Sequence, residues 1–120
     1  MSVLVRNLTT RHDMPLVDEA QADALAAGEG AVALFFPGNP QTNGESNDVA
    51  VILPELVAAF QGRFTAAVVA PDAEKALAAR HGVFVMPNLV FLRRGQVLGT
   101  IPKIQDWNVY MTKISAILEG

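Results

Sequence analysis

The second half of the chain alternates strand and helix signals and then closes with two strands separated by a short turn. The expected elements are a strand at 64–70, a helix that starts at Pro71 and stops at Gly82, strands at 88–92 and 97–101, and a helix at 106–118. Gly95 and its neighbours suit a β-hairpin turn. Strands joined by helices and followed by a hairpin predict an α/β fold with a mixed central sheet flanked by helices.

The first half supplies a short helix and a buried strand. Asp18 is expected to cap an alanine-rich helix that Gly28 ends. Residues 31–36 form an uninterrupted apolar run, typical of a strand buried on both faces. The first dozen residues fit either a short helix or an edge strand. We therefore expect an amino-terminal extension at 1–14 and, since 120 residues suit one domain, a single domain at 15–120.

A polar loop and a longer helix follow the buried strand. Gly, Asn, Pro and Ser crowd residues 37–48, and apolar residues at helical spacing then run from Val49 to Phe60. Pro54 lies inside this helix, where the lost hydrogen bond should kink the axis. The expected caps of this helix are Ser46, Asn47 or Asp48. The last helix of the chain is expected to bury Trp107, Tyr110 or Met111, Ile114 and Leu118.

Composition excludes several classes of function. Residues 1–60 carry eight acidic and two basic side chains, and residues 61–120 carry four acidic and seven basic ones. No basic stripe with interleaved aromatics occurs, which argues against nucleic-acid binding. No apolar run approaches the roughly 20 residues that span a bilayer. The amino terminus lacks the pattern of an export signal, so we expect a cytoplasmic protein that does not insert into a membrane.

The sequence offers little for metal or nucleophilic chemistry. It has no cysteine, and its two histidines, His12 and His81, are far apart. No metal-ligand set and no glycine-rich phosphate loop is present, so no metal or other cofactor is expected. Ser46 has no identifiable base beside it in the sequence, which favours a helix-capping role over a nucleophilic one.

The order of elements resembles the thioredoxin fold, most specifically between Asp72 and Gly95. This segment holds a helix, Gly82-Val83, Met86-Pro87, an apolar strand and a glycine turn. The resemblance implies that Pro87 follows a cis peptide bond and lies beside the helix that carries the active site in thioredoxins. Pro54 matches the kinking proline of that helix.

The chain departs from redox thioredoxins at the positions that carry their chemistry. Counting back from Pro54 places the family's two cysteines at Ser46 and Val49. The buried aspartate of redox thioredoxins aligns with Leu34, and the loop from Phe36 to Ser46 is longer than they need. Because thiol–disulfide exchange requires a thiolate, this chain is expected to bind rather than to transfer electrons.

The long polar loop, Gly82-Val83-Phe84, Met86-Pro87 and the strand Leu89-Val90-Phe91 together resemble the HyaE/HupG/HoxO family of hydrogenase maturation proteins. The resemblance covers nearly the whole chain. It implies a thioredoxin-like protein without the paired cysteines, acting as a non-enzymatic chaperone of nickel–iron uptake hydrogenase. Its implied partners are the small-subunit precursor, with its twin-arginine signal peptide, and other maturation proteins.

A receptor for such a peptide should offer acidic groups beside an apolar groove, because the peptide is positively charged and then apolar. The residues expected to supply this surface are Glu45, Ser46, Asp48, Phe84, Met86 and Pro87. Methionine suits adaptable peptide surfaces. Two alternatives stay open: a cysteine-free thioredoxin-like module that binds peptides without a dedicated client, and an enzyme that uses Ser46 or an acid pair.

Overall fold

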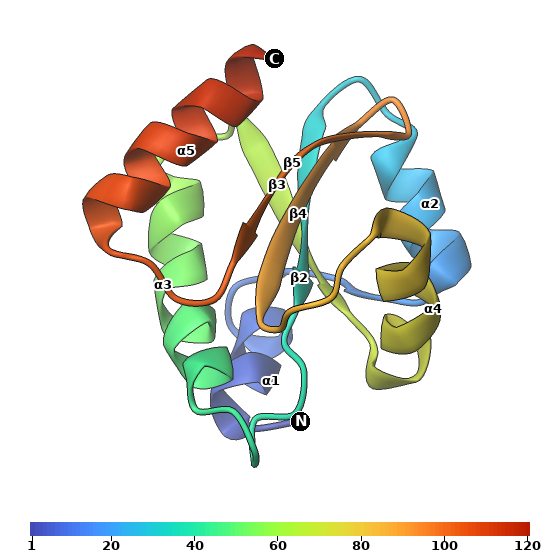
Figure 1. Ribbon diagram of the computed structural model, residues 1–120, viewed down its shortest axis with the longest axis vertical. Coiled ribbons are helices and arrows are strands. Elements are labelled where there is room, and N and C mark those ends of the chain that lie inside the picture. The colour runs from blue at the N-terminus through green and yellow to red at the C-terminus, as the bar shows by residue number, and fades with distance from the viewer.

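The apolar run at residues 31–36 forms the middle strand of a five-stranded mixed sheet (Figure 1). The structure is a computed structural model that describes residues 1–120. The elements are α1 (Val3–Thr10), β1 (Leu16–Val17), α2 (Glu19–Ala26), β2 (Ala31–Phe36), α3 (Glu45–Ala59), β3 (Phe64–Val69), α4 (Pro71–His81), β4 (Asn88–Arg93), β5 (Gln96–Pro102) and α5 (Trp107–Glu119). The strand order is β1-β3-β2-β4-β5. β1, β2 and β3 are parallel, β4 is antiparallel to β2, and β5 is antiparallel to β4, which confirms the mixed α/β architecture.

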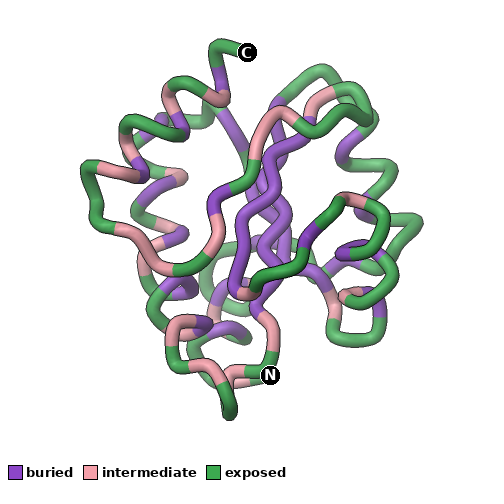
Figure 2. Tube along the Cα trace, viewed as in Figure 1, coloured by how far each residue is buried: buried purple, intermediate pink, exposed green.

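Helices cover both faces of the sheet and create two cores. All six residues of β2 are buried, and they alternate between the two cores, as the period of a strand requires (Figure 2). Ala31, Ala33 and Phe35 pack with α1, α3 and α5, whereas the other three residues of β2 pack with α2 and α4. The continuous apolar run is explained by this two-sided burial. No helix is long and apolar enough to cross a bilayer.

The segment 1–14 contains a helix that packs on α3. Val5 and Leu8 are buried in the same core as the interior of α3. The Ser2 hydroxyl accepts the Val5 N–H at 3.1 Å and donates to Asn47 at 2.6 Å, so the start of α1 is fixed to the start of α3. The segment expected as an extension thus contributes to the core of residues 15–120.

α3 begins earlier than the polar loop suggests, and the expectation that Ser46, Asn47 or Asp48 caps it is wrong. The helix starts at Glu45, so all three residues lie in its first turn. Asn43 supplies an acceptor for the Glu45 N–H at 3.1 Å. The Ser46 hydroxyl is buried and donates to the Pro37 carbonyl instead. Pro54 lies inside the helix as expected.

The remaining boundaries follow their sequence signals, with one exception in α5. Gly82 ends α4 in the left-handed conformation with φ 69°, and Arg94 and Gly95 turn the hairpin with φ 53° and 75°. α5 buries Tyr110, Ile114 and Leu118, but Trp107 is 40% exposed, which corrects the expectation that it is buried. Helical side chains tilt toward the amino terminus of their helix, so the side chain of Trp107, the first residue of α5, projects beyond the amino-terminal end of the helix.

Candidate functional site

An open groove of ≈ 490 Å³ runs between α4 and the chain that leads into β4. Small side chains on α4 leave room for it, and the segment from Val83 to Met86 forms the opposite wall. The residues that line it are Pro71, Glu74, Lys75, Ala78, Ala79, Val83, Phe84 and Met86. Most of this lining is apolar, so the groove can accept apolar side chains of a partner.

Phe84 is the most exposed large apolar residue of the protein, with 92% of its surface accessible. Its neighbour Val85 is also exposed. Covering a phenylalanine ring completely contributes roughly 1.5–3 kcal/mol, so a partner that covers Phe84 gains affinity at no expense to the fold. A ring displayed in this way at the rim of an apolar groove is a candidate contact surface.

Met86 is fixed in place by the loop that follows β2. The peptide bond between Met86 and Pro87 is cis. Gly38, with φ +70°, approaches so closely that a Cβ there would lie 2.9 Å from Met86 Cβ. The Asn43 side-chain amide donates to the Met86 carbonyl at 2.7 Å. The wall of the groove at Met86 is therefore in direct contact with the 37–44 loop.

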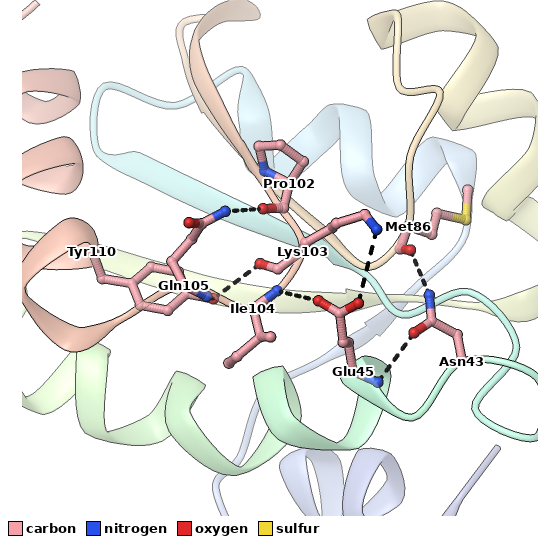
Figure 3. A network of polar contacts seen from close by, with 8 residues as sticks. All are labelled: Asn43, Glu45, Met86, Pro102, Lys103, Ile104, Gln105 and Tyr110. Carbon is pink, nitrogen blue, oxygen red and sulfur yellow. Dashed lines mark hydrogen bonds and ion pairs between the residues drawn. The ribbon is translucent and has the colours of Figure 1, made fainter.

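A polar network secures the same turn from the other side (Figure 3). The Lys103 N–H donates to the Pro87 carbonyl at 2.7 Å, and the Tyr110 hydroxyl donates to the Lys103 carbonyl at 3.2 Å. Glu45 accepts the Ile104 N–H at 3.1 Å and lies 3.9 Å from the Lys103 ammonium. Burial raises the pKa of the Tyr110 hydroxyl. This network joins the starts of α3 and α5 to the turn that carries Pro87.

The structure separates the six residues expected to form the binding surface. Phe84 and Met86 line the groove, and Pro87 is buried behind it. Ser46 is buried as well, with its hydroxyl committed to the Pro37 carbonyl. Two acidic residues lie outside the groove lining: Glu45 is engaged with the loop after β5, and Asp48 is exposed on α3.

Glu74 is an acidic residue of the groove that sequence reasoning missed. Its carboxylate accepts the Gly38 N–H at 2.9 Å. Burial raises the pKa of this carboxyl, and the hydrogen bond from Gly38 offsets part of the rise. The available signal was helical spacing, since Glu74 shares a face of α4 with the buried residues Leu77 and Ala78. Acidic side chains are rarely buried without a partner, so an acidic residue next to buried helical positions is a candidate for a specific contact.

A second hollow of ≈ 250 Å³ adjoins the groove on the side of α1. Its lining consists of Met1, Val5, Pro37, Gly38, Asn39, Pro40, Pro71 and Glu74. Pro71 and Glu74 belong to both linings, so the two hollows meet at the first turn of α4. The structure gathers no group of three or more His, Cys, Asp or Glu side chains that could hold a metal ion.

Comparison with known proteins gives a consistent family. The family model described as hydrogenase-1 expression protein HyaE matches residues 4–110. The hydrogenase expression/formation protein HupG of Rhizobium leguminosarum bv. viciae is 50% identical, over 98% of this chain and 81% of that protein. The hydrogenase expression/formation protein HoxO of Azotobacter vinelandii is 42% identical, over 98% of this chain and 78% of that protein.

Solved structures agree with the fold. A crystal structure from Rhodopseudomonas palustris CGA009, assigned to a hydrogenase expression/formation protein HupG, is 47% identical with a TM-score of 0.62, covering 88% of this chain and 95% of that one. The N21Q thioredoxin of Halobacterium salinarum NRC-1 has a TM-score of 0.70 at 24% identity, covering 90% of this chain and 94% of that one. The latter likeness shows a thioredoxin-like fold.

Proposed function

Because the chain belongs to the HyaE family of hydrogenase expression/formation proteins, we propose that it is a non-catalytic chaperone that binds the hydrogenase small-subunit precursor through its twin-arginine signal peptide. Such a peptide combines positive charge with an apolar stretch. In this proposal the protein acts in the cytoplasm, before export, and other maturation proteins are further candidate partners.

The observation that carries the proposal is the exposed ring of Phe84 at the rim of an apolar groove. Met86 lies in the same groove, and its flexible, polarisable side chain suits contact with varied apolar residues. The network behind Pro87 keeps this wall in place without a bound partner. A preformed groove costs less ordering on binding than a mobile one.

The side chains at the positions of the thioredoxin cysteines support binding rather than catalysis. The chain has no thiol, and Val49 occupies one of those positions. At the other, Ser46 is buried and hydrogen-bonded to a carbonyl oxygen, so its hydroxyl has neither a base nor access to a substrate. An enzyme that uses Ser46 is therefore the weakest of the alternatives.

Two acidic residues remain in the proposal because they contribute a negative electrostatic potential near the groove. Glu45 and Asp48 place negative charge in the first turn of α3. Neither lines the groove, so their proposed effect is attraction of a basic peptide at a distance, which salt screens.

The runner-up is a thioredoxin-like module that binds peptides without a dedicated client, and it differs in selectivity. The test is a calorimetric titration of the purified protein with the signal peptide of the small subunit and with a scrambled peptide of the same composition. A dedicated chaperone binds the natural sequence about tenfold more tightly or better. Equal affinity for the two peptides would favour the module without a dedicated client, and no binding of either would refute both.

A further inference from the structure

The carboxylate of Glu74 lies where the two hollows on this face meet. One hollow extends toward the 37–40 loop and α1, and the other extends toward Phe84. A peptide that runs along both must pass over the first turn of α4. Glu74 is the only acidic residue in either lining.

This carboxylate is partly desolvated, and one of its oxygens is open to an incoming group. Oε2 accepts the Gly38 N–H, whereas Oε1 accepts no hydrogen bond from the protein and is not among its buried unsatisfied atoms. The three ion pairs of the protein involve other acidic residues. A half-buried carboxylate without a cation is costly, and an incoming cation that shares the site recovers part of that cost.

We propose, on the basis of the proposed function, that the Glu74 carboxylate binds an arginine side chain of the peptide. The apolar residues of the peptide then lie toward Phe84 and Met86. A guanidinium fits this site better than an ammonium, because it is more weakly hydrated and presents paired donors to a carboxylate. The site therefore selects arginine over lysine.

The apolar lining sets the direction of the peptide, since each hollow carries one basic group. Lys75 lines the Phe84 side, where its methylene stem adds to the apolar wall. Met1, with the amino-terminal ammonium, and the polar Asn39 line the hollow near Pro40. The arginine of the peptide thus lies at the junction, against Glu74, and the apolar part lies over α4 toward Phe84.

The test is a calorimetric titration with two peptides of equal length, one with an arginine pair followed by an apolar stretch and one with lysines at the same positions. The protein variants are wild type, Glu74→Gln and the control Asp72→Asn. Asp72 lies in the same turn, is exposed and lines neither hollow, so the control removes one charge without touching the site. Urea unfolding of each variant shows that the fold is retained.

The expected result has two parts. Glu74→Gln weakens binding of the arginine peptide about tenfold or more, whereas Asp72→Asn changes it less than about threefold. The preference of the wild type for arginine over lysine disappears in Glu74→Gln. If wild type binds the arginine peptide and Glu74→Gln binds it equally well, the role of Glu74 is wrong and the proposed function stands. If wild type fails to bind the arginine peptide above a scrambled one, both proposals fall.

Discussion

The backbone N–H of Gly38 donates a hydrogen bond of 2.9 Å to the carboxylate of Glu74, which joins the loop after β2 to the first turn of α4. The two residues are 36 positions apart in the chain. Their contact fixes an acidic group between two hollows on a face where Phe84 is fully displayed. Substitutions at Gly38 and Glu74 should therefore change the unfolding free energy, whereas substitution of the exposed Phe84 should change peptide affinity alone.

Glu74→Gln should leave the protein at least as stable as wild type at neutral pH. Burial raises the folded pKa of the carboxyl above its ordinary 4.5, so the protonated form favours the fold. That contribution is complete below the unfolded pKa and is lost as pH rises through the folded pKa. The unfolding free energy of wild type, measured relative to Glu74→Gln by urea denaturation, should fall as pH rises from below 4.5 to neutral. If the unfolding free energy of wild type instead rises relative to Glu74→Gln over this pH range, the pKa of Glu74 is not raised by burial.

Gly38→Ala should destabilise the protein by about 1–3 kcal/mol, because the new Cβ would meet Met86 and the backbone has φ +70°. Gly30→Ala is the matched control, since no atom lies within 4 Å of its would-be Cβ and its φ is not in the left-handed region. Thermal or urea unfolding should separate the two variants. Equal unfolding free energies of Gly38→Ala and Gly30→Ala would show that the 37–44 loop can move away from Met86 at no cost.

Phe84→Ala should reduce peptide affinity about tenfold and leave the unfolding free energy within about 0.5 kcal/mol of wild type. The reason is that the ring is 92% exposed and packs on nothing it would destabilise by leaving. Val51→Ala truncates an apolar side chain of α3 that is 55% exposed and lies outside the groove, and it should change neither quantity. Unchanged affinity of Phe84→Ala in a calorimetric titration would remove the groove from the account.

Reversal of Glu45 and Asp48 to lysine should weaken binding of a basic peptide at low salt and have little effect at high salt, because these residues act through the field. Glu45→Lys also deprives the Ile104 N–H of its acceptor, so a loss of about 1 kcal/mol of stability is expected from that change alone. Asp48→Lys by itself serves as the control for the field. If the affinity for a basic peptide at low salt is the same in wild type and in both lysine variants, these two residues have no part in binding.

The periodic elements could be predicted because their signals are local. The run at residues 31–36, Pro71 at the start of α4 and Gly82 at its end each determine their own backbone. The same holds for the turn at Gly95. Phe84 and Met86, expected at the binding surface from their position before Pro87, both line the groove, and their contact with a partner stays a prediction.

The polar part of the face could not be read in the same way, because it depends on contacts between distant segments. Glu45 appeared free in the sequence, but the loop after β5 supplies its partners Lys103 and Ile104. Ser46 looked like a cap, yet the preceding strand ends beside it and its hydroxyl turns to the Pro37 carbonyl. Glu74 becomes part of a site only when the loop at Gly38 folds against α4.

The central claim, that the face around Phe84 receives the signal peptide, is tested most directly by NMR. Backbone amide signals of the labelled protein are recorded during titration with the small-subunit signal peptide. The account predicts that the largest shifts lie at Gly38, at Glu74 to Ala79 and at Val83 to Met86. Shifts confined to β5 and the exposed face of α5, with the signals around Phe84 unmoved, would contradict it.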